Sequence, residues 1–360
     1  MVNHKKILIA TGGTGGHIYP AMETAGELVR RGWEVRFIGS FGAAGEKLTA
    51  RGFSHIDIKA RGFVSRSPWQ KFLALVFLLR AFVRCVREVV TFKPGVVLGF
   101  GGYSSFPAVI AGRFLGVRTM IHEQNASPGL ANRVLARFVG KIAVSFRDTG
   151  NFFPKDKIVW TGYPVRPLGA CRSREEILRE HGFDDRRKTI LVFGGSQGSR
   201  AINECVVSCF ERFNAAEPLQ VIHLAGRGGA ERLKARYARL SFPVLLQDYA
   251  DNMSELYALA DVVIARAGAG TVTELGLLGL ISILIPYPYA NSHQEANARV
   301  LAQHEAAVII KEKDLNPGML GDKIFLALGS VARREFLRQK LSQDVLLDAV
   351  ARVSDEVERL

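Results

Sequence analysis

Short apolar runs alternate along the chain with longer amphipathic stretches and glycine-rich turns. In the first half the runs predict strands at 6–10, 34–38, 54–58, 95–98, 117–121, 141–145 and 158–160. In the second half they predict strands at 189–193, 220–224, 243–246, 261–265, 281–285 and 307–310. Helical sequence lies between the strands, beginning with residues 20–31. This alternation predicts an α/β protein whose parallel sheets are covered by helices on both faces.

A proline- and glycine-rich break at residues 162–167 separates two such series. The charge balance changes at the same place. Residues 1–166 hold 24 Lys and Arg against 9 Asp and Glu, a net charge of +15, whereas the rest hold 24 against 25, a net charge of −1. The basic half should therefore face an anionic partner. We expect a domain at 1–164, a second at 165–342, and a C-terminal helix at 343–360 that could pack back on the first domain.

The composition excludes several classes of protein. With 48% hydrophobic and 23% charged residues, the 360-residue chain is neither disordered nor fibrous. Its four cysteines show no CxxC spacing and are too few for a disulfide scaffold. We find no metal-binding motif and expect neither a metal nor a cofactor. The apolar run after Lys6 is too short for a signal peptide, and no apolar stretch is long enough to span a membrane.

Three glycine-rich turns carry most of the chemical information. They are residues 12–17 (GGTGGH), 99–105 (GFGGYSS) and 194–199 (GGSQGS), and each follows a predicted strand. Glycines let the backbone approach phosphate oxygens, and the next helix offers unpaired N–H groups. The alternative is three tight strand–helix connections. A nicotinamide dehydrogenase fits poorly, because GxGxxG read from Gly13 places Ile18 at the third glycine and no carboxylate ends the second strand.

A fourth turn, GAGTVTE at residues 268–274, follows the strand at 261–265. Thr271 and Glu274 have the spacing of a helix capping box. The functional alternative is a helix N-terminus that binds a diphosphate, with Glu274 accepting from the hydroxyls of a ribose. The two interpretations are partly compatible.

The motifs together closely resemble the MurG family of glycosyltransferases. They are GGTGGH, Gly101-Gly102-Tyr103, HEQN at 122–125, GYPVR at 162–166, GGSQGS, GAGTVTE and Gln294, in that order over essentially the whole chain. The resemblance implies the GT-B fold, in which two Rossmann-like domains with parallel sheets face a cleft. It also implies inverting transfer of GlcNAc from UDP-GlcNAc to the MurNAc 4-hydroxyl of lipid I, which gives lipid II for peptidoglycan. The enzyme would act peripherally at the cytoplasmic face of the cell membrane.

The resemblance also assigns residues to the site. The residues implied for UDP-GlcNAc are Thr14, Gly15, Gly16, Asn125, Arg166, Ser196, Ala250, Ala269, Gly270, Thr271, Val272, Thr273, Glu274 and Gln294. Those implied for the acceptor diphosphate are Gly13, Gly101, Gly102 and Tyr103. His17 is the candidate general base; the alternative is that it only positions the acceptor diphosphate. We interpret His122 as support for Asn125. Two departures from the family pattern are Tyr163, where an asparagine is usual, and the segment 286–292.

A basic, apolar helix within residues 63–90 is the candidate membrane contact. Residues 51–100 hold nine basic and two acidic side chains. The residues expected to meet the bilayer and anionic headgroups are Phe72, Leu75, Leu79, Arg80, Phe82 and Arg84. The alternative is a buried core helix with a solvated end.

Other functions remain open from the residues alone. One is a related GT-B enzyme acting on another glycolipid, and another is a UDP-GlcNAc epimerase, which would not need the basic helix. A third is a non-catalytic module that binds a nucleotide sugar. Nucleic acid is not expected as a partner, because few aromatic residues stand among the basic ones.

Overall fold

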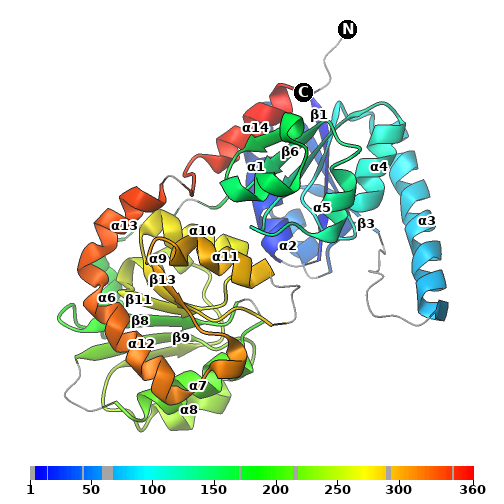
Figure 1. Ribbon diagram of the computed structural model, residues 1–360. Coiled ribbons are helices and arrows are strands. Elements are labelled where there is room, and N and C mark those ends of the chain that lie inside the picture. Colours follow the sequence, from blue (N-terminus) through cyan, green and yellow to red (C-terminus); the bar gives the residue numbers. More distant parts are fainter. Residues whose placement is uncertain are drawn as a thin grey trace. The chain divides into compact units, whose positions relative to one another are not determined.

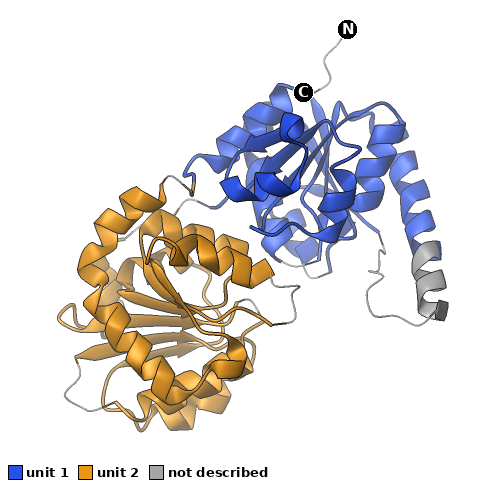
Figure 2. Cartoon of the chain, in the orientation of Figure 1, with its two compact units in different colours: residues 1–166, 346–360 blue, residues 167–345 orange. Residues whose placement is uncertain are grey.

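The computed structural model divides the chain into two compact units of parallel α/β structure (Figures 1 and 2). One unit comprises residues 1–166 and 346–360, and the other comprises residues 167–345. These breaks fall two to three residues beyond the boundaries expected from the sequence. The structure describes residues 5–13, 15–42, 44–58, 68–166, 168–169, 172–195, 197–213, 218–288, 293–342 and 344–360, with backbone only for 68–75.

Unit 1 is built on a sheet whose described part has seven parallel strands, in the order β3-β2-β1-β4-β5-β6-β7. The strands are β1 (Lys6–Gly12), β2 (Glu34–Ser40), β3 (Ser54–Asp57), β4 (Val96–Gly99), β5 (Arg118–Glu123), β6 (Lys141–Val144) and β7 (Ile158–Trp160). The helices are α1 (Gly15–Arg30), α2 (Ala44–Ala50), α3 (Pro68–Phe92), α4 (Phe106–Phe114), α5 (Leu130–Leu135) and α14 (Ala349–Glu358). Successive residues of β1 alternate between two buried clusters, with Leu8 in one and Ile7 and Ile9 in the other. Helices therefore cover both faces of the sheet.

Unit 2 repeats this architecture with a sheet of six strands among its described residues, in the order β10-β9-β8-β11-β12-β13. The strands are β8 (Lys188–Phe193), β9 (Leu219–Leu224), β10 (Val244–Gln247), β11 (Val262–Ala265), β12 (Ile281–Leu284) and β13 (Ala307–Ile309). The helices are α6 (Arg174–Glu180), α7 (Arg200–Phe210), α8 (Gly229–Tyr237), α9 (Met253–Leu259), α10 (Ala269–Leu278), α11 (His293–Ala302), α12 (Pro317–Gly329) and α13 (Arg334–Leu341). Every strand expected from the sequence is present, with ends shifted by at most two residues. The predicted α/β fold with two parallel sheets is confirmed.

Helix α1 begins at Gly15, five residues before the predicted start at Pro20. The prediction placed the proline at the first helical position, where its missing N–H costs nothing. Inside the helix, Pro20 cannot donate to the carbonyl of Gly16, four residues earlier. The hydroxyl of Tyr163 supplies that hydrogen bond instead, at 3.0 Å. The helix extends over His17, and a distant, buried tyrosine replaces the donor that proline lacks.

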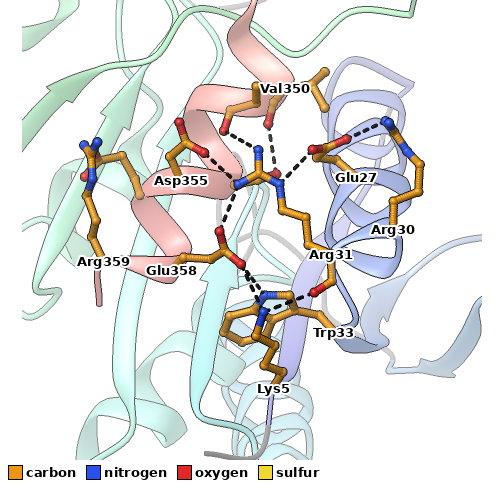
Figure 3. A network of polar contacts seen from close by, with 12 residues as sticks. Lys5, Glu27, Arg30, Arg31, Trp33, Val350, Asp355, Glu358 and Arg359 are labelled. Carbon is orange, nitrogen blue, oxygen red and sulfur yellow. Dashed lines mark hydrogen bonds and ion pairs between the residues drawn. The ribbon is translucent and has the colours of Figure 1, made fainter.

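The C-terminal helix α14 packs against α1 in unit 1 (Figure 1). Val353 and Val357 are buried in the core cluster on that face of the sheet. Arg31, just after α1, pairs with Asp355 at 2.6 Å and with Glu358 at 3.0 Å (Figure 3). Apolar burial and ion pairs therefore join the last residues of the chain to its first helix.

Candidate functional site

The carboxyl ends of β1, β4 and β5 lie side by side, because β4 pairs with both of the other strands. The glycine turns that follow β1 and β4 pack against each other there. A Cβ atom on Gly102 would lie 3.0 Å from the carbonyl oxygen of Gly12, and the Ser104 hydroxyl donates to the carbonyl of Thr11 at 3.3 Å. Gly102 also has a φ of 77°, which other residues rarely adopt. The close approach of the two turns thus requires glycine.

His17 lies half-buried in the first turn of α1, beside these turns. Its Nδ1 is 2.9 Å from Oε1 of Gln124, which follows β5. A Cβ atom on Gly101 would lie 3.3 Å from the imidazole and 3.2 Å from that amide oxygen. The structure therefore brings together His17, Gly101 and Gly102, and it adds Gln124, to which the sequence analysis gave no role.

His122 is fully buried behind Gln124. Its Nε2 is 2.9 Å from the carbonyl oxygen of Gly162, and its Nδ1 is 3.0 Å from Nε2 of Gln124. The ring stacks on Phe100 with 5.2 Å between centroids. Burial lowers the pKa of His122 to about 4, so the side chain is neutral near pH 7.

Asn125 is held by Glu123, to which the sequence analysis gave no role. Oε1 of Glu123 accepts from the backbone N–H of Asn125 at 2.9 Å and from its side-chain Nδ2 at 3.2 Å. Oε2 accepts from the N–H of Gly129 and from Asn132 Nδ2, at 3.1 and 2.8 Å. Within the HEQN motif, Glu123 therefore orders the loop that carries Asn125.

In unit 2, helix α10 begins at the GAGTVTE turn. Its N-cap is Gly268, so Thr271 lies inside the helix and the predicted capping box does not form. Oε2 of Glu274 instead accepts from the hydroxyl of Tyr257 at 2.8 Å. Val272 and Thr273 are buried, and their side chains belong to the core. The backbone N–H of Val272 already donates to the carbonyl of Gly268 at 2.9 Å.

Gln294 lies in the first turn of α11 with its carbonyl oxygen fixed. Oε1 accepts from the backbone N–H groups of Ala267 and Tyr287, at 3.2 and 2.9 Å. These two residues follow the neighbouring strands β11 and β12. The amide of Gln294 therefore joins two strand ends, and its remaining donors are its two N–H bonds.

Arg266, to which the sequence analysis gave no role, links three turns at the same edge. It is 8% exposed. Its guanidinium donates to the carbonyl of Ile285 at 3.1 Å and to the hydroxyl of Ser199 at 2.7 Å, and it pairs with Glu312. Its position two residues before the GAGTVTE turn is the signal that could have revealed it. A buried arginine there holds the ends of β8, β11 and β12 in register.

Comparisons with known proteins agree with this arrangement. Residues 7–144 match the glycosyltransferase family 28 N-terminal domain, and residues 189–337 match the family 28 C-terminal domain. A relative from Halothermothrix orenii is 40% identical over 86% of both chains, and one from Bacillus subtilis is 34% identical over 99% of both. Each is named UDP-N-acetylglucosamine--N-acetylmuramyl-(pentapeptide) pyrophosphoryl-undecaprenol N-acetylglucosamine transferase. The crystal structure of MurG from Acinetobacter baumannii is 28% identical and superimposes with a TM-score of 0.79 over 99% of both chains.

The chain belongs to the MurG family.

Membership in the MurG family confirms the resemblance drawn from the motifs, the GT-B fold and the class of enzyme, an N-acetylglucosaminyltransferase. A UDP-GlcNAc 2-epimerase from Methanocaldococcus jannaschii also superimposes, with a TM-score of 0.62 at 10% identity. At that identity the likeness concerns the fold alone. The epimerase alternative is therefore not favoured.

Some of the positions that the MurG resemblance assigns fall outside the described structure. Thr14 and Ser196 are not described, nor are the side chains of Phe72 and Leu75. The guanidinium of Arg166 lies over the ring of Tyr19, 5.8 Å from its centroid. Further positions are half-buried or exposed: Gly13 and Gly16 are exposed, Gly15, Ala250 and Gly270 are half-buried, and Tyr103 is 40% exposed.

Helices α3 and α4 present an apolar and basic surface. Leu79 and Val83 on α3 are 56% and 67% exposed, and Phe114 at the end of α4 is 78% exposed. Arg80 and Arg84 are exposed beside them. We call these five residues the α3–α4 surface. No helix in the described ranges combines the length and the apolar character needed to cross a bilayer.

Phe82 does not lie on the exposed face that the sequence analysis assigned to it. It is half-buried, packs on the core of unit 1 and meets the ring of Phe114 edge to face, with 6.3 Å between centroids. One residue along, Val83 occupies the exposed position. Both residues stand between Arg80 and Arg84 in the sequence, and Val83 lies on the face that these arginines share.

Proposed function

We propose that this chain transfers N-acetylglucosamine from UDP-N-acetylglucosamine to the 4-hydroxyl of the N-acetylmuramoyl group of lipid I, giving lipid II with inversion at the sugar carbon. The names of its relatives supply the substrates. The observation that carries the proposal is the setting of His17. Its imidazole is half-buried and hydrogen-bonded through Nδ1, beside glycine turns of the kind that bind phosphate.

In the proposed reaction His17 takes the proton of the acceptor hydroxyl. The hydroxyl oxygen forms a bond to the anomeric carbon, while the bond from that carbon to the β-phosphate oxygen breaks. UDP leaves with the electron pair and gains negative charge. Unpaired backbone N–H groups at the start of α10, from Ala269 and Gly270, would stabilise that charge together with the turn at 194–199.

Unit 2 would hold the donor. Glu274 would accept from the ribose hydroxyls, Ala250 would offer its backbone to the uracil, and the N–H donors of Gln294 would reach hydroxyls of the sugar. The further donor contacts that we propose are Thr14, Gly15, Gly16, Asn125, Arg166, Ser196 and Thr271. Unit 1 would hold the acceptor diphosphate through Gly13, Gly101, Gly102 and Tyr103.

Unit 1 would also bind the membrane that carries the acceptor lipid. The α3–α4 surface supports this part of the proposal, because exposed apolar side chains can enter the interface while arginines meet anionic headgroups. The protein would then work as a peripheral enzyme at the cytoplasmic face of the membrane.

The test is a transfer assay with purified full-length protein, UDP-GlcNAc and a short-chain lipid I analogue. We expect UDP and a β-linked disaccharide product to form in equal amounts, and only when the acceptor is present. Conversion of UDP-GlcNAc without acceptor would indicate an epimerase. Binding of UDP-GlcNAc with no turnover at any acceptor concentration would indicate a non-catalytic module.

A further inference from the structure

A continuous chain of hydrogen bonds runs from the end of β7 to the imidazole of His17. The carbonyl oxygen of Gly162 contacts Nε2 of His122 at 2.9 Å. Nδ1 of His122 contacts Nε2 of Gln124 at 3.0 Å, and Oε1 of Gln124 contacts Nδ1 of His17 at 2.9 Å. All four residues belong to unit 1.

The orientation of the Gln124 amide follows from a second contact. Its Nε2 also lies 3.1 Å from the backbone carbonyl of His122. A carbonyl oxygen only accepts, so the group that faces it is the amide NH₂. The opposite atom, which faces His17, is therefore the carbonyl oxygen of Gln124.

The orientation of this amide then determines which nitrogen of each imidazole carries the proton. Nε2 of His122 faces the Gly162 carbonyl and must carry a proton. The neutral ring accepts at Nδ1, where it receives the second N–H of Gln124. Burial, which lowers the pKa of His122 to about 4, agrees with a neutral ring. Since Oε1 of Gln124 cannot donate, Nδ1 of His17 must carry the proton that fills the contact between them.

We propose that Gln124, oriented by His122, is a positioning residue that holds His17 as the Nδ1–H tautomer with the lone pair on Nε2. This inference rests on the proposed function, in which His17 takes the acceptor proton. When Nε2 takes that proton, the hydrogen bond from Nδ1 to Gln124 is kept, so no group must reorient during the reaction. A His17 in the other tautomer would have no lone pair on Nε2.

The surroundings keep this geometry rigid. Gln124 is 1% exposed and His122 is 0% exposed, so water does not compete for their hydrogen bonds. Gly101 covers the contact between His17 and Gln124 so closely that a Cβ atom there would lie 3.2 to 3.3 Å from both side chains. Among the described residues, no other hydrogen bond to the His17 imidazole is found, so its tautomer depends on Gln124.

The test replaces Gln124 with methionine, which has a similar shape but no amide. We expect kcat for transfer to fall about 10- to 10³-fold, as when the partner of a catalytic histidine is lost, while KM for UDP-GlcNAc changes less than about twofold.

The matched control is Gln220→Met. Gln220 is also fully buried and uses its amide on Asp184 and Thr189, but it lies near the amino end of β9. We expect that variant to keep its kcat.

The readout that a merely structural role would not move is the nitrogen NMR spectrum of the histidine rings. His17→Asn identifies the His17 signals. In the wild type, Nδ1 should be protonated and Nε2 unprotonated, and in Gln124→Met the two nitrogens should average. A wild-type His17 protonated on Nε2 would overturn the inference, even where the variant fails to fold.

The transfer assay separates the two proposals. A tautomer that is lost in Gln124→Met with an unchanged kcat would contradict both the positioning role and His17 as the base. A wild type with the expected tautomer but without transfer would contradict only the proposed function.

Discussion

At the scale of single residues, His17 depends on groups far away in the sequence. Gln124 holds its ring, and Tyr163 holds the carbonyl of the preceding residue, Gly16. The motif GGTGGH could suggest a phosphate-binding turn with a histidine, but not these partners. They are brought to His17 by the order of strands in the sheet, which local sequence does not encode.

The contribution of the Tyr163 hydroxyl to stability should depend on the N–H that Pro20 lacks. We expect Tyr163→Phe to lower the free energy of unfolding by about 0.5–1.5 kcal/mol, since it leaves the Gly16 carbonyl without that donor. In a Pro20→Ala background the helix N–H is restored, and the same substitution should cost less. Denaturant unfolding of the four proteins in this cycle measures the coupling. Equal costs in both backgrounds would contradict the explanation.

The side-chain N–H groups of Gln294 should contribute to binding of UDP-GlcNAc more than to binding of UDP. Gln294→Glu keeps an oxygen for the N–H groups of Ala267 and Tyr287 but loses the N–H donors. We therefore expect binding of UDP-GlcNAc to weaken by about 1–3 kcal/mol, with a smaller loss for UDP, which has no sugar. Calorimetry with both ligands measures this difference. Gln303→Glu, just after α11, controls for the added charge, and equal losses for UDP and UDP-GlcNAc would rule out the sugar contact.

His122 should remain neutral well below pH 6.5. Burial lowers its pKa to about 4, so the unfolded chain takes up a proton there before the folded protein does. The free energy of unfolding should then fall as the pH drops from about 6.5 to about 4, by up to about 3 kcal/mol from this residue. His223, whose pKa burial lowers to about 3, acts in the same direction. NMR titration resolves the two rings, and a His122 signal that titrates near pH 6.5 would contradict the argument.

At the scale of helices and strands, the apolar runs were sufficient to predict every strand within two residues. Helix starts were harder. Helix α1 begins five residues before the predicted start, and the T-x-x-E pattern in α10 lies inside the helix rather than at its cap. Strands in a parallel sheet are buried on both faces and leave a continuous apolar signal. Helix ends depend on single hydrogen bonds to distant residues, which no local pattern shows.

The α3–α4 surface gives a test at this scale. Leu79→Glu and Val83→Glu should each reduce binding to vesicles that contain anionic lipid, without lowering the melting temperature, because both side chains are exposed. Leu326→Glu, at a position 57% exposed on α12 of unit 2, is the matched control and should leave vesicle binding unchanged. Variants of Leu79 and Val83 that bind vesicles as the wild type does would exclude this surface.

At the scale of the whole molecule, the positive charge is concentrated in one of the two units, and the chain leaves this unit and later returns to it. The excess of +15 lies in residues 1–166, which carry the α3–α4 surface and the turns proposed for the acceptor diphosphate. The chain then builds unit 2 and returns through α14 to α1. The sequence suggested that the last helix could pack back, but the ion pairs of Arg31 with Asp355 and Glu358 join residues over 320 positions apart and could not be predicted from spacing.

The measurement that tests the account most directly is the rate of GlcNAc transfer by His17→Asn at saturating UDP-GlcNAc and lipid I analogue. Asparagine can still donate a hydrogen bond but cannot accept the proton. We expect kcat to fall about 10²- to 10⁴-fold, UDP-GlcNAc affinity to stay nearly constant, and the acidic limb of the pH–rate profile to disappear. A variant with nearly wild-type kcat, an unaltered pH profile and only a raised KM for the acceptor would show that His17 positions the acceptor diphosphate and is not the base.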